Sequence, residues 1–162
     1  AESIGPNPQI SGAGAVNVIY GSAIGLSATF EQIWSRSNPD VSGSPAGKHE
    51  YFGYAIVSGN FDGDFNVSNE VECDDLAIGV PGANEVNVLY GSPSGITVLN
   101  EQLWRQGSDG IAGAVEEYDD FGRALAVGDY DCNGIDDLLG HNLVRRLKGD
   151  LHQAGISGRA YF

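Results

Sequence analysis

The sequence predicts an all-β fold assembled from a repeated unit of short antiparallel strands. Two observations lead to this prediction. Residues 16–22 (VNVIYGS) recur as residues 86–92 (VNVLYGS), and a Phe-Gly pair at Phe52 recurs at Phe121. Self-similarity with a period of about seventy residues is typical of an array of supersecondary units, each of which buries its apolar face against a neighbour.

Each strand of the unit has its own justification in the sequence. Residues 54–58 and their copy 124–128 are short and apolar, as expected of an inner strand covered on both faces. A second apolar run at 76–80 ends in a Pro-Gly turn. Residues 86–90 alternate with a period of two, and the more polar run 98–104 follows a Gly- and Ser-rich turn. Four short antiparallel strands per period are typical of the blade of a β-propeller.

The amino-acid sequence of the unit also resembles that of a known family of repeats. The opening Phe-Gly pair, the acidic loop that follows, and the closing run LAIGVPG at residues 76–82 resemble the FG-GAP repeat of integrin α-subunit propellers and their bacterial relatives. The resemblance covers residues 3–139. It implies an extracellular β-propeller with calcium-binding loops in its blades.

The acidic loop at residues 129–137 is the clearest candidate metal site. It places oxygen-bearing side chains at alternate positions, then a glycine, then another carboxylate. Ca²⁺ takes roughly six to eight hard oxygen ligands, and a chain that curls round the ion presents alternate positions to it. By the resemblance, Ile135 lends its carbonyl, Asp136 is a neighbour that does not bind, and the side-chain ligands are Asp129, Asp131, Asn133 and Asp137.

The equivalent loop one unit earlier departs from this pattern. Its matching positions are Asn60, Asp62, Asp64 and Asp75, but residues 65–72 interrupt the motif and no glycine follows Asp64. We expect a second calcium site that is weaker or that uses a different closing ligand, with Asp64, Glu70 or Glu72 supplying oxygens. The alternative is that both loops are solvated turns, because Asp, Asn and Gly are common turn residues.

The strands add up to about two blades in a single partial propeller. Residues 51–106 form a complete blade, while 1–50 and 107–162 form partial ones, the latter with an atypical insertion at 141–153. A closed propeller has about four to eight blades, so this content leaves the ring incomplete. Either the remaining blades belong to a longer propeller, or copies associate head to tail as a homo-oligomer and complete each other's blades.

Composition excludes several classes of partner. The net charge of −14 argues against binding to nucleic acid or to anionic membranes, both of which require basic patches. No apolar run is long enough to insert in a bilayer. Cys73 and Cys132 lie in or beside the two acidic loops, and we expect them to be unpaired, because loops on neighbouring blades are too far apart for a disulfide.

Little in the sequence points to catalysis. The three histidines, His49, His141 and His152, stand apart, and the clustered carboxylates are explained by metal binding. Trp34 and Trp104 occupy equivalent places in successive repeats, which favours packing between blades over stacking on sugars. We therefore expect a protein that is not an enzyme.

The leading functional hypothesis is a secreted or cell-surface propeller module, with structural Ca²⁺, that mediates adhesion or binds another macromolecule, either a protein or a glycan. Secretion is inferred because weak calcium sites work where calcium is abundant. The alternatives are a propeller lectin and an accessory propeller of a secreted hydrolase. Exposed aromatic residues beside clefts between blades would favour the lectin, a flat polar upper face would favour protein adhesion, and a clustered acid–base pair would favour the enzyme.

Overall fold

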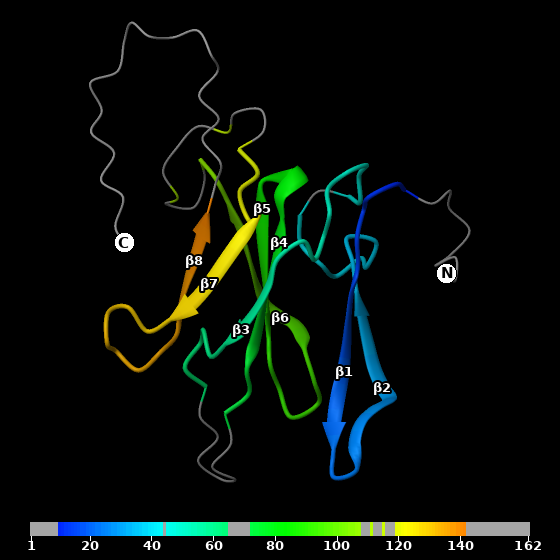
Figure 1. Ribbon diagram of the computed structural model, residues 1–162, viewed down its shortest axis with the longest axis vertical. Coiled ribbons are helices and arrows are strands. Elements are labelled where there is room, and N and C mark those ends of the chain that lie inside the picture. The colour runs from blue at the N-terminus through cyan, green and yellow to red at the C-terminus, as the bar shows by residue number, and fades with distance from the viewer. Residues whose placement is uncertain are drawn as a thin grey trace, which may run out of the picture.

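The computed structural model describes residues 10–43, 45–64, 72–107, 111, 115 and 119–141, and it is all-β (Figure 1). Most of the predicted insertion at 141–153 and residue Glu70 lie outside the described part of the chain. The described strands form three antiparallel sheets, none of which closes on itself. In this part of the chain no helix is long and apolar enough to cross a membrane.

The central sheet has four strands in the order β3-β4-β5-β6, as the sequence predicts for one complete unit. A two-stranded sheet lies on either side of it, β1-β2 before and β7-β8 after (Figure 1). One 3₁₀ turn, η1 at Pro81–Ala83, joins β4 to β5. The strands are β1 Val16–Ser22, β2 Gly25–Trp34, β3 Ile56–Gly59, β4 Asp75–Val80, β5 Glu85–Tyr90, β6 Thr97–Arg105, β7 Ala124–Gly128 and β8 Asp137–His141.

The repeat seen in the sequence extends to the hydrogen-bond register. Val16 pairs with Trp34 between β1 and β2, and Val86 pairs with Trp104 between β5 and β6, which are the same positions one repeat later. Both pairs also shift register at the same place, just before the tyrosine of the Val-Asn-Val-x-Tyr run. The two hairpins are therefore equivalent parts of successive units.

One detail of the predicted strands is wrong. The first strand of the unit begins at Ile56 instead of residue 54, because Tyr54 belongs to a turn in which its N–H donates to the carbonyl of Tyr51 at 2.9 Å. This strand is not covered on both faces either. Ile56 is 47% exposed, since β3 is short and forms the edge of the central sheet.

The core lies between the sheets, and it repeats as the strands do. Val16, Val18 and Trp34 pack against the β4–β5 face that carries Ile78 and Leu89. The corresponding residues one repeat later, which are Val86, Val88 and Trp104, belong to a second cluster with Leu125 of β7 and Leu138 of β8. Both tryptophans thus pack against the core, as predicted from their equivalent positions.

The Phe-Gly pair positions each unit on the sheet before it. Phe52 and Phe121 are 2% and 6% exposed, and the glycines that follow them have φ of +88° and +85°. A Cβ on Gly79 of β4 would lie 1.9 Å from the carbonyl oxygen of Gly122. Only glycine allows this direct approach of two backbones at a positive φ.

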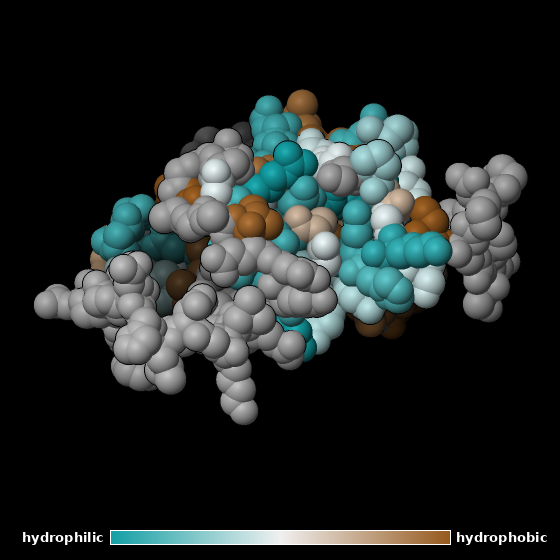
Figure 2. Space-filling model, turned by 90° about the horizontal axis from the view of Figure 1, so that it is seen from above, coloured by the Kyte–Doolittle hydropathy of each residue, from teal (hydrophilic) through white to brown (hydrophobic). Residues whose placement is uncertain are grey.

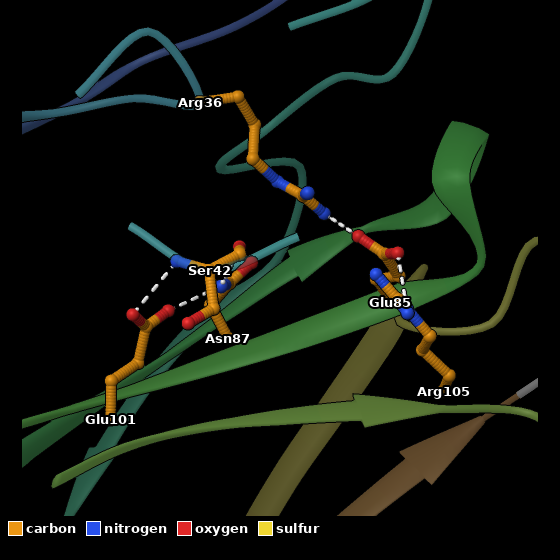
Figure 3. Close-up of polar contacts among 6 residues, drawn as sticks. All are labelled: Arg36, Ser42, Glu85, Asn87, Glu101 and Arg105. Carbon is orange, nitrogen blue, oxygen red and sulfur yellow. Dashed lines mark hydrogen bonds and ion pairs between the residues drawn. The ribbon is translucent and has the colours of Figure 1, made fainter. Parts of the chain in front are cut away.

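A buried ion pair joins the segment after β2 to the central sheet (Figure 3). Arg36 donates to Glu85, and the two residues are 5% and 3% exposed. Glu85 also accepts a hydrogen bond from Nε of Arg105 at 2.6 Å. The position equivalent to Arg36 holds Gln106 one repeat later, and the position equivalent to Glu85 holds Ala15 one repeat earlier, so neither charge is part of the repeated pattern.

A second polar cluster, also drawn in Figure 3, holds the segment after β2 against β5 and β6. The Nδ2 of Asn87 donates to the carbonyl of Ser42 at 2.9 Å and to Oε1 of Glu101 at 2.6 Å. The N–H of Ser42 in turn donates to Oε2 of Glu101 at 2.9 Å. The buried amide of Asn87 therefore has two acceptors where it meets the neighbouring segment.

Breaking the Arg36–Glu85 pair from one side should destabilise the protein strongly. Glu85→Gln leaves a buried guanidinium without its carboxylate, and we expect the free energy of unfolding in urea to fall by about 3–5 kcal/mol. The double variant Arg36→Gln, Glu85→Ala, which copies the residues of the equivalent positions, should recover most of this loss. The exposed Arg123→Gln should have little effect. A double variant as unstable as Glu85→Gln would contradict the interpretation.

Candidate functional site

The loop between β7 and β8 brings three carboxylates together. Oxygens of Asp129, Asp131 and Asp137 all lie within 4.8 Å of one another. Asp137 is the first residue of β8 and is partly buried, whereas Asp129 and Asp131 are exposed on the loop. These are three of the four side-chain ligands that the sequence predicts, and three carboxylates this close repel one another unless a cation lies between them.

The loop curls because its own side chains hold its backbone. The N–H of Asn133 donates to Oδ1 of Asp129 at 3.0 Å and to Oδ1 of Asp131 at 3.1 Å, and the N–H of Gly134 donates to Oδ2 of Asp129 at 2.9 Å. Gly134 has φ of +87°, which permits the sharp turn before the chain returns to β8. The carboxylates therefore face the interior of a tight loop.

The other two predicted ligands of this loop are less clearly placed. Oδ1 of Asn133 accepts a hydrogen bond from the N–H of Ile135 at 2.7 Å, which occupies one of its two lone pairs. Ile135 is 37% exposed and lies against Gly63 of the preceding acidic loop, where an added Cβ would be 2.9 Å from its Cδ1. The Asn133 amide oxygen thus takes part in the loop's own hydrogen bonding.

The preceding loop is organised differently around its closing acid. Asp75 is 1% exposed, and each of its carboxylate oxygens accepts a backbone hydrogen bond, Oδ1 from Gly91 at 2.8 Å and Oδ2 from Phe61 at 2.7 Å. Burial raises the pKa of Asp75 above its ordinary value, although the two N–H donors oppose this. Asp75 therefore has a structural task whether or not it binds a cation.

The remaining residues of this loop make Asx-type turns. Oδ1 of Asn60 accepts from the N–H of Gly63 at 2.8 Å, and Oδ1 of Asp62 accepts from the N–H of Asp64 at 2.9 Å. Within the described residues, Asp62, Asp64 and Asp75 do not gather into a three-carboxylate group like that of the next loop. The relative strength of the two candidate sites stays a prediction, because Glu70, one of the expected alternative ligands, lies outside the described residues.

The closing acids are nevertheless anchored alike. The N–H of Phe61 donates to Oδ2 of Asp75, and the N–H of Tyr130 donates to Oδ2 of Asp137 at 2.8 Å. In each loop the donor is the residue directly after the first expected ligand position, Asn60 or Asp129. The interruption at residues 65–72 therefore leaves this anchor intact.

A reciprocal contact connects the two loops, and sequence reasoning missed it. The N–H of Asn60 donates to Oδ2 of Asp136 at 3.0 Å, and the N–H of Asp136 donates to the carbonyl of Asn60 at 3.0 Å. The sequence identified Asp136 only as a neighbour of the ligands. Its side chain fastens the loop of one unit to the loop of the unit before.

The free cysteines lie at these loops but are not paired with each other. Cys73 is partly buried and Cys132 is exposed. Burial, together with the carboxylates of Asp64 and Asp75, raises the pKa of the Cys73 thiol. A raised pKa leaves less of the reactive thiolate at neutral pH, so the environment of Cys73 does not activate it as a nucleophile.

Asp75→Asn should destabilise the protein in calcium-free buffer. Because both carboxylate oxygens accept from backbone N–H groups, the amide NH₂ would face a donor, and the free energy of unfolding should fall by about 1–3 kcal/mol. Asp74→Asn, at the exposed residue next to Asp75, should leave the free energy of unfolding unchanged.

This effect should depend on pH in a definite direction. The pKa of Asp75 is raised in the folded state, so its contribution to stability is present below the unfolded pKa and is lost as pH rises through the folded pKa. The stability difference between wild type and Asp75→Asn should therefore narrow as pH increases, measured by urea unfolding in EDTA. A difference that widens with pH would contradict the assignment.

Comparison with protein-family models, with characterised proteins and with solved structures finds no significant match for this chain.

Proposed function

We propose that this protein is a calcium-stabilised module of β-propeller type, secreted or exposed at a cell surface, that binds another macromolecule and has no catalytic activity. The observation that carries the proposal is the meeting of Asp129, Asp131 and Asp137 in one loop of a repeating structural unit. Hard carboxylate oxygens at alternate positions of a tight loop suit Ca²⁺ better than softer metals.

The stacking of the sheets supports the propeller part of the proposal. Two successive interfaces use the same repeat positions, with Val16 and Trp34 in one and Val86 and Trp104 in the next. Units that each contact only the next unit, and always through equivalent residues, are a property of radial and linear repeat folds. Four antiparallel strands in the central sheet match the size of a propeller blade.

The chemistry of the candidate metal site supports an extracellular location. Asp129 and Asp131 are exposed, and a largely exposed cluster of three carboxylates resembles the weak calcium sites of extracellular modules more than a high-affinity cytosolic site. The ligand of the module is a protein or a glycan. The exposed rings of Tyr51 and Tyr54, which are 43% and 53% exposed beside a cleft between units, favour a glycan.

Calcium should stabilise the fold through the second acidic loop. At a hundredfold excess over the dissociation constant, binding to the native state alone gives about 2.7 kcal/mol, so EDTA should lower the melting temperature by several degrees. Asp137→Asn should abolish most of this response. Asp136→Asn should lower stability, because Asp136 accepts from Asn60, but it should leave the response to calcium in place.

Calorimetric titration with CaCl₂ and thermal melts with and without EDTA provide the measurements. A melting temperature indifferent to EDTA in the wild type would refute the calcium proposal. Equal loss of the calcium response in both variants would refute the assignment of Asp136 as a neighbour. Two equally tight sites would contradict the expected weakness of the first loop.

The third sheet leaves a groove beside the second core cluster. It has a volume of about 480 Å³ and lies between Val88 and Trp104 on one side and Leu138 on the other. Strands equivalent to β5 and β6 would fill it in a complete unit, either from a longer chain or from β1–β2 of another copy. His141 of β8 is the register equivalent of Gly79 of β4. A Cβ on Gly79 would lie 1.9 Å from the Phe-Gly turn of the next unit. In both cases, therefore, the Phe-Gly turn that packs on His141 has to shift.

Light scattering on the 162-residue chain distinguishes the two sources. Head-to-tail pairing predicts a defined trimer, or a polymer, at micromolar concentration, and His141→Gly should strengthen it by removing the steric conflict. A stable monomer that His141→Gly leaves unchanged would refute pairing between copies and favour a longer propeller.

A further inference from the structure

A cleft of about 750 Å³ lies at the end of the sheets opposite to the acidic loops. It is formed by the turn before β3, by η1 and by the turn before β7. Figure 2 views the molecule from this end and shows a described surface that is mostly hydrophilic, with small apolar patches. The side chains that matter on the cleft are those of Lys48, His49, Tyr51, Tyr54, Asn84 and Arg123.

The cleft is built from two equivalent turns that carry different side chains. Tyr51 to Tyr54 surrounds the first Phe-Gly pair, and Asp120 to Arg123 surrounds the second. Each turn is closed by a hydrogen bond of 2.9 Å from the N–H of its last residue to the carbonyl of its first. The first residue has φ of +58° in one turn and +51° in the other. The backbone of the turn therefore requires a left-handed residue at this place.

Asp120 satisfies this requirement at low cost, but Tyr51 does not. Aspartate adopts the left-handed region more readily than most residues, whereas a bulky side chain with positive φ is an outlier. The ring of Tyr51 is 43% exposed, so burial in the core does not account for its presence. His49, two residues earlier, also has φ of +60°. Strain that the fold itself does not need is a sign of function.

The planar side chains of the cleft form a continuous row. The rings of His49 and Tyr51 are 5.8 Å apart, those of Tyr51 and Tyr54 are 6.2 Å apart at 70°, and the guanidinium of Arg123 lies 5.5 Å from the Tyr54 ring centre. Nδ1 of His49 is 3.1 Å from the hydroxyl of Tyr51. The row thus presents ring faces together with hydrogen-bonding groups, over a length that suits a chain more than a compact small molecule.

The charge of the cleft contrasts with that of the whole protein, which is −14. Of the four Lys and Arg residues in the described part of the chain, Arg36 is buried and Arg105 is bound to Glu85. The other two, Lys48 and Arg123, both line the cleft. Asp120 also lines the cleft and forms an ion pair with Arg123 at 2.7 Å, whereas Lys48 is exposed and supplies the net positive charge of the lining. Cations at this one place favour a ligand that carries carboxylates.

We propose that this cleft binds a carbohydrate chain that carries carboxylate groups, such as a chain containing uronic or sialic acid. Sugar rings present flat C–H faces that stack on tyrosine and hydroxyl rims that accept and donate hydrogen bonds, and the row of planar groups offers both. A peptide would need a deep apolar pocket for an anchoring side chain, and the cleft's aliphatic lining is limited to Pro81 and Val115. The inference rests on the proposed binding role, but it does not depend on calcium.

The decisive variant is Tyr51→Asn. Asparagine accepts positive φ and is uncharged, so the variant should melt at the same temperature as the wild type or higher, while its binding to carboxylate-bearing glycans falls roughly tenfold or more. Phe30→Ala, at an aromatic side chain 79% exposed on β2, is the matched control and should bind like the wild type. The probe is a glycan array that carries uronic-acid, sialic-acid and neutral oligosaccharides, followed by calorimetry on the strongest acidic glycan.

Arg123→Gln should narrow the preference for acidic over neutral glycans without abolishing binding. No binding of the wild type to any acidic glycan, binding that Tyr51→Asn leaves unchanged, or binding of an acidic peptide in place of glycans would each overturn the inference. The calcium response of the melting temperature is measured on the same Tyr51→Asn protein. If Tyr51→Asn keeps the calcium response and loses glycan binding, the cleft is separate from the metal site. If either the calcium proposal or the glycan proposal fails, the result for the other can still be interpreted.

Discussion

The stacking of one unit on the next depends on the close approach of two backbones at the Phe-Gly turn. The carbonyl of Gly122 lies where any side chain on Gly79 would have to be, and at the first Phe-Gly turn the carbonyl oxygen of Phe52 lies 2.2 Å from where a Cβ on Gly14 would be. Because these contacts involve glycine at positive φ, the angle between successive sheets is set by main-chain geometry. The apolar clusters and the Arg36–Glu85 pair then fill the space that this approach leaves.

The two ends of the sheets carry different chemical groups. At one end, the loops between the first and second strand of each unit hold carboxylates, and their backbones are organised by their own side chains. At the other end, the turns before the first strand carry aromatic and cationic groups. Tyr51 and Asp120 show the consequence at a single repeat position. The backbone is the same, but one unit uses the residue that suits the conformation and the other uses a residue that the conformation disfavours.

The sequence predicted the fold of the central unit well because each level of its pattern pointed the same way. Period-two alternation placed β5, the repeated Val-Asn-Val-x-Tyr run placed β1, and the equivalent tryptophans indicated where the sheets pack. The start of β3 was misplaced because an apolar run alone does not distinguish a strand from the turn that precedes it.

For the candidate site, spacing along the chain identified Asp129, Asp131 and Asp137, because the proximity of these three carboxylates requires only a local turn of the chain. The contact of Asp136 and the cleft could not be found in this way. Asp136 binds Asn60 of another unit, and the cleft is lined by turns of two units, so both exist only when the units are stacked. The buried position of Asp75 likewise depends on Gly91, which lies beyond the next strand.

The reciprocal contact between Asn60 and Asp136 has a consequence for the stiffness of the two units that it joins. Asn60, the first expected ligand position of the earlier loop, is held by one main-chain and one side-chain hydrogen bond from the loop of the following unit, so the two acidic loops are directly connected. A force that pulls the two sheets apart at this end must break both hydrogen bonds between Asn60 and Asp136 before it strains the core. A cation in the second loop would tighten the segment that carries Asp136, and so transfer rigidity backwards along the chain from one unit to its predecessor.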